Sequence, residues 1–98
     1  MSTDPTISII IPSYNHAAYI GETIESLLSQ SFGDFELIIV DDGSSDDSPA
    51  LIKTYAAQDS RIIPIFQGNK GPSAAVNRGL QIARGRFVTC HPSDDRSH

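Results

Sequence analysis

The sequence predicts a three-layer α/β fold with a mainly parallel sheet of about four strands in the order 3-2-1-4. Four short apolar segments alternate along the chain with three segments whose apolar residues have helical spacing. In a sheet with one solvent-exposed face, apolar and polar residues alternate along each strand. The apolar segments here lack this strict alternation, so we expect strands that are covered by helices on both faces. The 98 residues suit one small domain, and we expect residues 1–98 to form a single unit.

The first half of the chain predicts a strand, a helix and a second strand. Residues 6–11 are mostly apolar and β-branched, and Pro12 ends this strand. A helix is expected over residues 17–30, where apolar residues recur at helical spacing. The second strand covers residues 35–40, an apolar run that only Glu36 interrupts.

The second half repeats this order. Ser48 reads as an N-cap followed by a proline at the first helical position, and this helix is expected to end near Ser60. Residues 61–66 form the third predicted strand. A third helix is expected from an N-cap at Ser73, and residues 86–90 form the last strand. The buried face of the third helix is expected to carry Val76, Leu80 and Ala83.

Residues that could bind a ligand or take part in catalysis follow the predicted strands at their carboxyl ends. Open parallel sheets bind ligands at this position. Asp41 and Asp42 follow the second strand and begin a turn-forming sequence. They are either a capped turn or acceptors for the N–H or hydroxyl groups of a ligand. Tyr14 follows the first strand, and its ring is either a partly buried loop aromatic or a stacking surface for a planar base.

Asp94 and Asp95 form a second acidic pair after the fourth predicted strand. Two adjacent carboxylates can bind a hard cation such as Mg²⁺ or Mn²⁺, which would also take diphosphate oxygens. The simpler interpretation is a solvated acidic terminus. Two acidic pairs at one edge of a sheet favour the metal site, because adjacent acids repel each other unless a cation or donor neutralises them.

Composition and motifs exclude several classes of function. The formal net charge is −5 and the seven Lys and Arg residues are scattered, which argues against a nucleic-acid partner. Neither the P-loop motif nor the G-x-G-x-x-G motif occurs. Cys90 is the only cysteine, so an internal disulfide is excluded and a reducing cytoplasm is permitted. The apolar segment at residues 7–11 is too short to span a membrane.

Longer motifs give the chain a family resemblance. Residues 9–15 (IIIPSYN) and 35–46 (FELIIVDDGSSD), followed by 77–80 (NRGL) and 83–88 (ARGRFV), resemble the opening of family 2 glycosyltransferases. The resemblance covers essentially the whole chain. It implies the Rossmann-like nucleotide-binding half of a GT-A glycosyltransferase domain, which transfers a sugar with inversion from a nucleoside-diphosphate-sugar, here a UDP-sugar, to an acceptor hydroxyl.

The resemblance also assigns roles to residues. Tyr14 would stack on or border the nucleobase, Asp42 would accept a hydrogen bond from a base N–H, and Asp41 would support the turn. Residues 93–95 fall where the family carries its D-x-D-type metal motif. The expected nucleotide-binding residues are Pro12, Tyr14, Asp41, Asp42 and Asp94, and the expected ligands of Mg²⁺ or Mn²⁺ are Asp94 and Asp95.

The chain departs from the family pattern at three points. Pro92 stands where many members have the first Asp of the metal motif, and Val76 stands where many have Arg. The chain is also about half as long as the family's catalytic domain, so the acceptor site and the general base are expected outside it. The implied partners are a nucleotide-sugar donor and a saccharide or lipid-linked acceptor, at the cytoplasmic face of a membrane or free in the cytoplasm. A core left exposed by the missing half would favour self-association.

Two other functions compete with this hypothesis. One is a nucleotide-binding or regulatory module without catalysis, derived from a truncated or degraded relative. The other is a receiver-like domain in which Asp41 and Asp42 form a phospho-acceptor pair. The second is disfavoured because receiver acids follow the first strand, whereas this pair follows the second, and because Lys70 precedes a helix.

Overall fold

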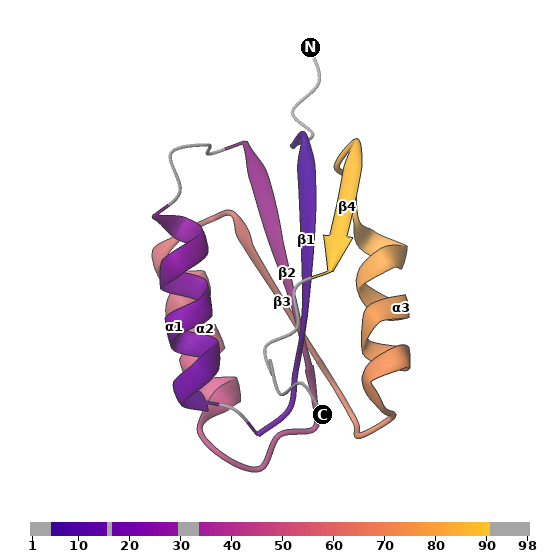
Figure 1. Cartoon of the computed structure of the whole chain (residues 1–98). Coiled ribbons are helices and arrows are strands. Elements are labelled where there is room, and N and C mark those ends of the chain that lie inside the picture. Colours follow the sequence, from indigo (N-terminus) through magenta and orange to yellow (C-terminus); the bar gives the residue numbers. More distant parts are fainter. Residues whose placement is uncertain (1–4, 16, 30–33, 91–98) are drawn as a thin grey trace.

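The computed structural model describes residues 5–15, 17–29 and 34–90 and confirms the predicted fold class. Its elements follow the order β1 (Ile7–Ser13), α1 (Ala17–Leu28), β2 (Phe35–Asp42), α2 (Ser48–Gln58), β3 (Ile62–Gln67), α3 (Pro72–Ile82) and β4 (Phe87–Cys90). All strand pairs are parallel and the sheet order is β3-β2-β1-β4, as predicted. Helices α1 and α2 lie on one side of the sheet and α3 on the other (Figure 1). None of these helices is long and apolar enough to cross a membrane.

The two faces of the sheet have separate cores. Alternate residues of β2 point to opposite faces, so Leu37 and Ile39 pack with α1 and α2, whereas Ile38 and Val40 pack toward α3. Every residue of β2 is buried, which explains its nearly continuous apolar sequence. The central position of β2 between β1 and β3 therefore fixes both helical layers.

The third helix packs through small residues, and here one prediction was wrong. Leu80 was expected on the buried face, but its side chain is 49% exposed. The buried positions are Ala75 and Gly79, one helical turn apart. A Cβ on Gly79 would lie 2.6 Å from Cγ2 of Ile10, so the helix approaches β1 too closely for a larger residue. The prediction failed because it placed large apolar side chains against the sheet, where this contact requires small ones.

Several predicted boundaries also shift by one or two residues. The N-cap of α3 is Gly71 rather than Ser73, with Pro at the start of the helix. The N-cap of α2 is Asp47 rather than Ser48. Strand β2 continues through Asp41 and Asp42, which were expected in a turn, because both pair with neighbouring strands. The two acids therefore belong to the rigid sheet and not to a loop.

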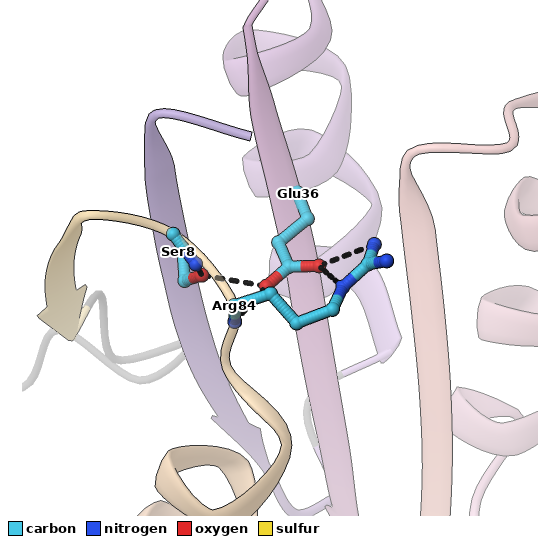
Figure 2. Close-up of polar contacts among 4 residues, drawn as sticks. Ser8, Glu36 and Arg84 are labelled. Carbon is cyan, nitrogen blue, oxygen red and sulfur yellow. Dashed lines mark hydrogen bonds and ion pairs between the residues drawn. The ribbon is translucent and has the colours of Figure 1, made fainter. Parts of the chain in front are cut away.

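A buried carboxylate joins the sheet to the end of α3 (Figure 2). Glu36 is 3% exposed, and its Oε2 accepts hydrogen bonds from Ser8 Oγ at 2.6 Å and Arg84 N at 2.8 Å. Its Oε1 accepts from Nε and Nη2 of Arg84 at 3.3 and 3.1 Å. Gly85 N donates to Ser8 Oγ at 2.7 Å. The network thus fixes the connection between α3 and β4 against the amino ends of β1 and β2.

The hydrogen bonds keep Glu36 ionised. Burial alone would raise its pKa, but the hydrogen bonds from Ser8 and Arg84 and the Arg84 charge together hold the pKa below its ordinary value. A carboxylate whose pKa is lowered by folding stabilises the folded state above its unfolded pKa. That contribution is lost as the pH falls through the folded pKa.

We predict that Glu36→Gln lowers the free energy of unfolding at pH 7 by about 1–3 kcal/mol, because the amide places donors against the Arg84 and Ser8 donors. The Arg84 side chain is 54% exposed, so solvent screening keeps the loss within this range. Urea unfolding at several pH values measures it. The difference from the unsubstituted chain should shrink in acid, below the ordinary Glu pKa.

The matched control is Glu22→Gln, an exposed position on α1, which should change stability by less than about 0.5 kcal/mol. A loss at Glu36 that is equal at pH 7 and in acid would show that the carboxylate charge contributes nothing.

Candidate functional site

Three strands bring their carboxyl ends to one edge of the sheet. Ser13 pairs with Asp41, and Asp42 pairs with Gln67, so β1, β2 and β3 end side by side. Neighbouring strands lie about 4.8 Å apart, which places the residues just beyond these ends within reach of one small ligand. Helix α3 begins shortly after β3 at the same edge. This edge is the position at which open α/β sheets bind ligands.

Asp42 is a buried acid at this edge with three hydrogen-bond donors around it. It is 5% exposed, and its Oδ1 accepts hydrogen bonds from Gln67 Nε2 at 3.0 Å and Lys70 N at 2.7 Å. Its Oδ2 accepts from Gly71 N at 2.9 Å. Three donors from β3 and the following loop therefore orient one carboxylate. A carboxylate has about four acceptor sites, so the contacts among the described residues leave one unused.

The environment of Asp42 also keeps it ionised. Burial would raise its pKa, but the hydrogen bonds from Gln67, Lys70 and Gly71, together with the charge of Lys70, hold the pKa below its ordinary value. An ionised carboxylate accepts hydrogen bonds and donates none. Asp42 can therefore recognise an N–H or O–H group of a ligand.

Asp41 has a different partner. It is 2% exposed and accepts hydrogen bonds from Ser44 Oγ at 2.6 Å and Ser44 N at 3.0 Å. The turn that follows β2 passes through Gly43 at φ +78°, where a Cβ would lie 2.8 Å from Asn69 N. Glycine is therefore required for this turn to lie against the loop that precedes α3. Asp41 fixes the turn.

The other predicted nucleotide-binding residues lie on β1 and just after it. Pro12 is half-buried within β1, pairs with Val40 and does not end the strand as expected. Tyr14 follows the last residue of β1, and its side chain is 46% exposed. The structure thus brings Tyr14 and Asp42 to adjacent strand ends. Asp94 and Asp95 lie outside the described residues.

Sequence reasoning missed a contact between two loops at this edge. Asn15 Oδ1 accepts hydrogen bonds from Ser45 N at 2.7 Å and Asp46 N at 3.3 Å. Asp46 in turn accepts from Ala17 N at 3.2 Å, at the start of α1. The available signal was an Asn two residues after a strand, since Asn is one of the few residues that readily adopt left-handed backbone conformations.

The described acids do not form a metal site. Among residues 5–15, 17–29 and 34–90, no group of three His, Cys, Asp or Glu side chains could hold a metal ion. The oxygens of Asp41 and Asp42 already accept hydrogen bonds from the protein. The donor set of Asp94 and Asp95, two carboxylates, is of the kind that Mg²⁺ and Mn²⁺ prefer. The metal hypothesis therefore depends on these two residues.

Comparison with known proteins relates the chain to glycosyltransferases. The family model described as Glycosyl transferase family 2 matches residues 8–98. Among relatives, the chain is 44% identical over 91 residues to the uncharacterized glycosyltransferase EpsJ of Bacillus subtilis. The match covers 93% of this chain and 26% of EpsJ.

Solved structures agree with this assignment. The fold matches S. aureus TarS 1–349 in complex with UDP-GlcNAc with a TM-score of 0.78 and 33% identity, over 91% of this chain and 26% of that one. It matches the mannosyltransferase PcManGT from Pyrobaculum calidifontis, in complex with GDP-Man and Mn²⁺, with a TM-score of 0.79 and 25% identity. That match covers 93% of this chain and 28% of PcManGT.

The chain thus spans about a quarter of the length of these proteins. The family model nevertheless covers nearly all of the chain. The chain belongs to glycosyl transferase family 2.

Proposed function

We propose that residues 1–98 form the nucleotide-sugar-binding half of a metal-dependent, inverting glycosyltransferase that uses a UDP-sugar. The observation that carries the proposal is the ionised, oriented Asp42 with one unused acceptor site, one residue beyond the Ser13–Asp41 pair. The relatives that were crystallised with UDP-GlcNAc and with GDP-Man support a nucleotide-sugar donor. We place the general base and the acceptor site, for a saccharide or a lipid-linked acceptor, outside this chain.

In this proposal Tyr14 and Asp42 recognise the base. The exposed ring of Tyr14 stacks on the planar uracil, and the remaining acceptor site of Asp42 receives the hydrogen bond of its ring N–H. Pro12 and Asp41 contribute by keeping the ends of β1 and β2 in place. These residues bind and orient the donor but transfer no proton.

The diphosphate of the donor needs a positive charge nearby, and the residues at this edge are mainly acidic. The chain carries a net charge of −5, and a diphosphate would be repelled by the acids at this edge. We propose that Asp94 and Asp95 hold Mg²⁺ or Mn²⁺. A cation bound there would neutralise the negative charge that develops on the leaving diphosphate when an acceptor hydroxyl attacks the anomeric carbon. The crystallised complex of PcManGT with Mn²⁺ supports this part of the proposal.

Phe87 and Val88 of β4 and Leu80 of α3 are large apolar side chains that remain exposed. We propose that these apolar side chains are covered either by further protein or by a second copy of the chain, which would make the isolated chain self-associate. We also propose that the protein acts in the cytoplasm or at the cytoplasmic face of a membrane.

We predict that Asp42→Ala weakens UDP binding by about 1–3 kcal/mol, because the ring N–H loses a buried acceptor. Calorimetric titration measures the affinity. Because Asp42 also orients the loop before α3, a second ligand isolates the direct contact. UDP methylated on the ring nitrogen should bind the unsubstituted chain more weakly than UDP does, yet bind Asp42→Ala as well as UDP does.

The matched control is Asp59→Ala. Asp59 is paired with Arg61 before the amino end of β3, at the opposite edge of the sheet, and its loss should leave UDP binding unchanged. Unchanged affinity of Asp42→Ala for UDP would remove Asp42 from the nucleotide site.

We predict that UDP binds at least about tenfold more tightly with Mn²⁺ than with EDTA, since a cation removes the repulsion between the diphosphate and the acids. Asp95→Ala should abolish this difference, whereas Asp47→Ala, at an exposed acid, should preserve it. Uridine, which has no diphosphate, should bind equally under both conditions. Equal affinity for UDP with Mn²⁺ and EDTA would mean that the departure at Pro92 has abolished the metal site.

A further inference from the structure

Asn15 has an unusual backbone conformation at the proposed donor site. Its φ is +51°, and it is the one non-glycine residue with positive φ in the part of the chain that the structure describes. The left-handed conformation costs free energy for residues with a Cβ, although Asn tolerates it better than most. Such a residue persists only where the surrounding contacts determine its conformation.

Hydrogen bonds hold Asn15 in this conformation. Its backbone N donates to Ser44 Oγ at 2.8 Å, and Ser44 Oγ donates in turn to Asp41 Oδ1 at 2.6 Å. Its side-chain Oδ1 accepts from Ser45 N at 2.7 Å and, more weakly, from Ser45 Oγ at 3.4 Å and Asp46 N at 3.3 Å. We call this set of residues, Asn15 with Ser44, Ser45 and Asp46, the Asn15 cluster. It joins the loop after β1 to the loop after β2 through both the backbone and the side chain of one residue.

The Asn15 cluster has two consequences for the edge. The backbone N–H groups of Ser45 and Asp46 are occupied by Asn15 Oδ1, so this pair of amides is not free for a diphosphate. Tyr14 lies between Ser13, which is paired in the sheet, and Asn15, which is held by the cluster. The backbone of Tyr14 is therefore fixed on both sides, although its ring is exposed.

We propose that Asn15 is a positioning residue that sets the direction of the Tyr14 ring for stacking on the nucleobase. This inference rests on the proposed function, since it assigns Asn15 a role at the same site. Glycine could adopt the same backbone conformation but would lack the oxygen that binds the second loop. Alanine would lack the oxygen and would also strain the backbone. Asn satisfies both requirements.

The test is uridine binding by Asn15→Gly, which keeps the backbone conformation accessible and removes only the side-chain contact. We expect a loss of affinity of roughly tenfold for uridine and by the same factor for UDP with Mn²⁺, because the effect acts on the base. Gln81→Ala, an exposed position on α3, is the control and should bind as the unsubstituted chain does. If Asn15→Gly does not fold, Ser44→Ala breaks the same cluster from the other loop and should give a loss in the same direction.

A double-mutant cycle separates positioning from general destabilisation. In a Tyr14→Ala background, Asn15→Gly should cause no further loss of uridine affinity, because the ring that it positions is gone. A further loss equal to that of the single variant would overturn the inference, as would an Asn15→Gly chain that binds uridine normally. If the unsubstituted chain binds neither uridine nor UDP, the proposed function itself fails.

Discussion

The parallel pairing of β1 with β2 is the constraint on which the rest of the structure depends. The register from Ile7 opposite Phe35 to Ser13 opposite Asp41 brings two loops to one edge of the sheet, although they are about thirty residues apart in the chain. It also places Ser8 beside Glu36 at the other end of the same strand pair. A shift of the pairing by one residue would turn every apolar side chain of β2 to the opposite face of the sheet. The packing of the two cores therefore disfavours any other register. The candidate site is therefore a direct consequence of how the core packs.

Strand β2 carries a buried carboxylate near each end, Glu36 and Asp42, and the two differ in how many hydrogen bonds they accept. Glu36 accepts four hydrogen bonds, two on each oxygen, which fills the acceptor capacity of a carboxylate. Asp42 accepts three. Both have pKa values below the ordinary range, because each has enough donors to offset its burial. Saturation makes Glu36 a structural residue, whereas the unsaturated Asp42, at the edge where such sheets bind ligands, retains the capacity to bind a further donor.

The sequence predicted the fold class and strand order because strand and helix segments alternate along it, and this alternation implies a parallel sheet with crossover connections. It also identified Tyr14, Asp41 and Asp42 as strand-end residues, and the structure places them there. It failed where the outcome depended on distances between elements. The close contact of Gly79 with Ile10 leaves Leu80 exposed on α3, and the bonds of Asn15 to the second loop are between residues that no local pattern connects. Glu36 was visible as an interruption of an apolar run, but its partner Arg84 is 48 residues away and could be found only in three dimensions.

We propose that the carboxyl edge of β1 and β2 binds the donor nucleotide. The most direct measurement is a titration of the isotopically labelled chain with UDP and Mg²⁺, followed by NMR of the backbone amides. We expect the largest shifts on Tyr14, on residues 42–46 and on Lys70 and Gly71. The amides of Ser8, Glu36 and Gly85, at the opposite end of the sheet, should remain unchanged. Shifts concentrated at that opposite end, or an unchanged spectrum at saturating UDP, would contradict it.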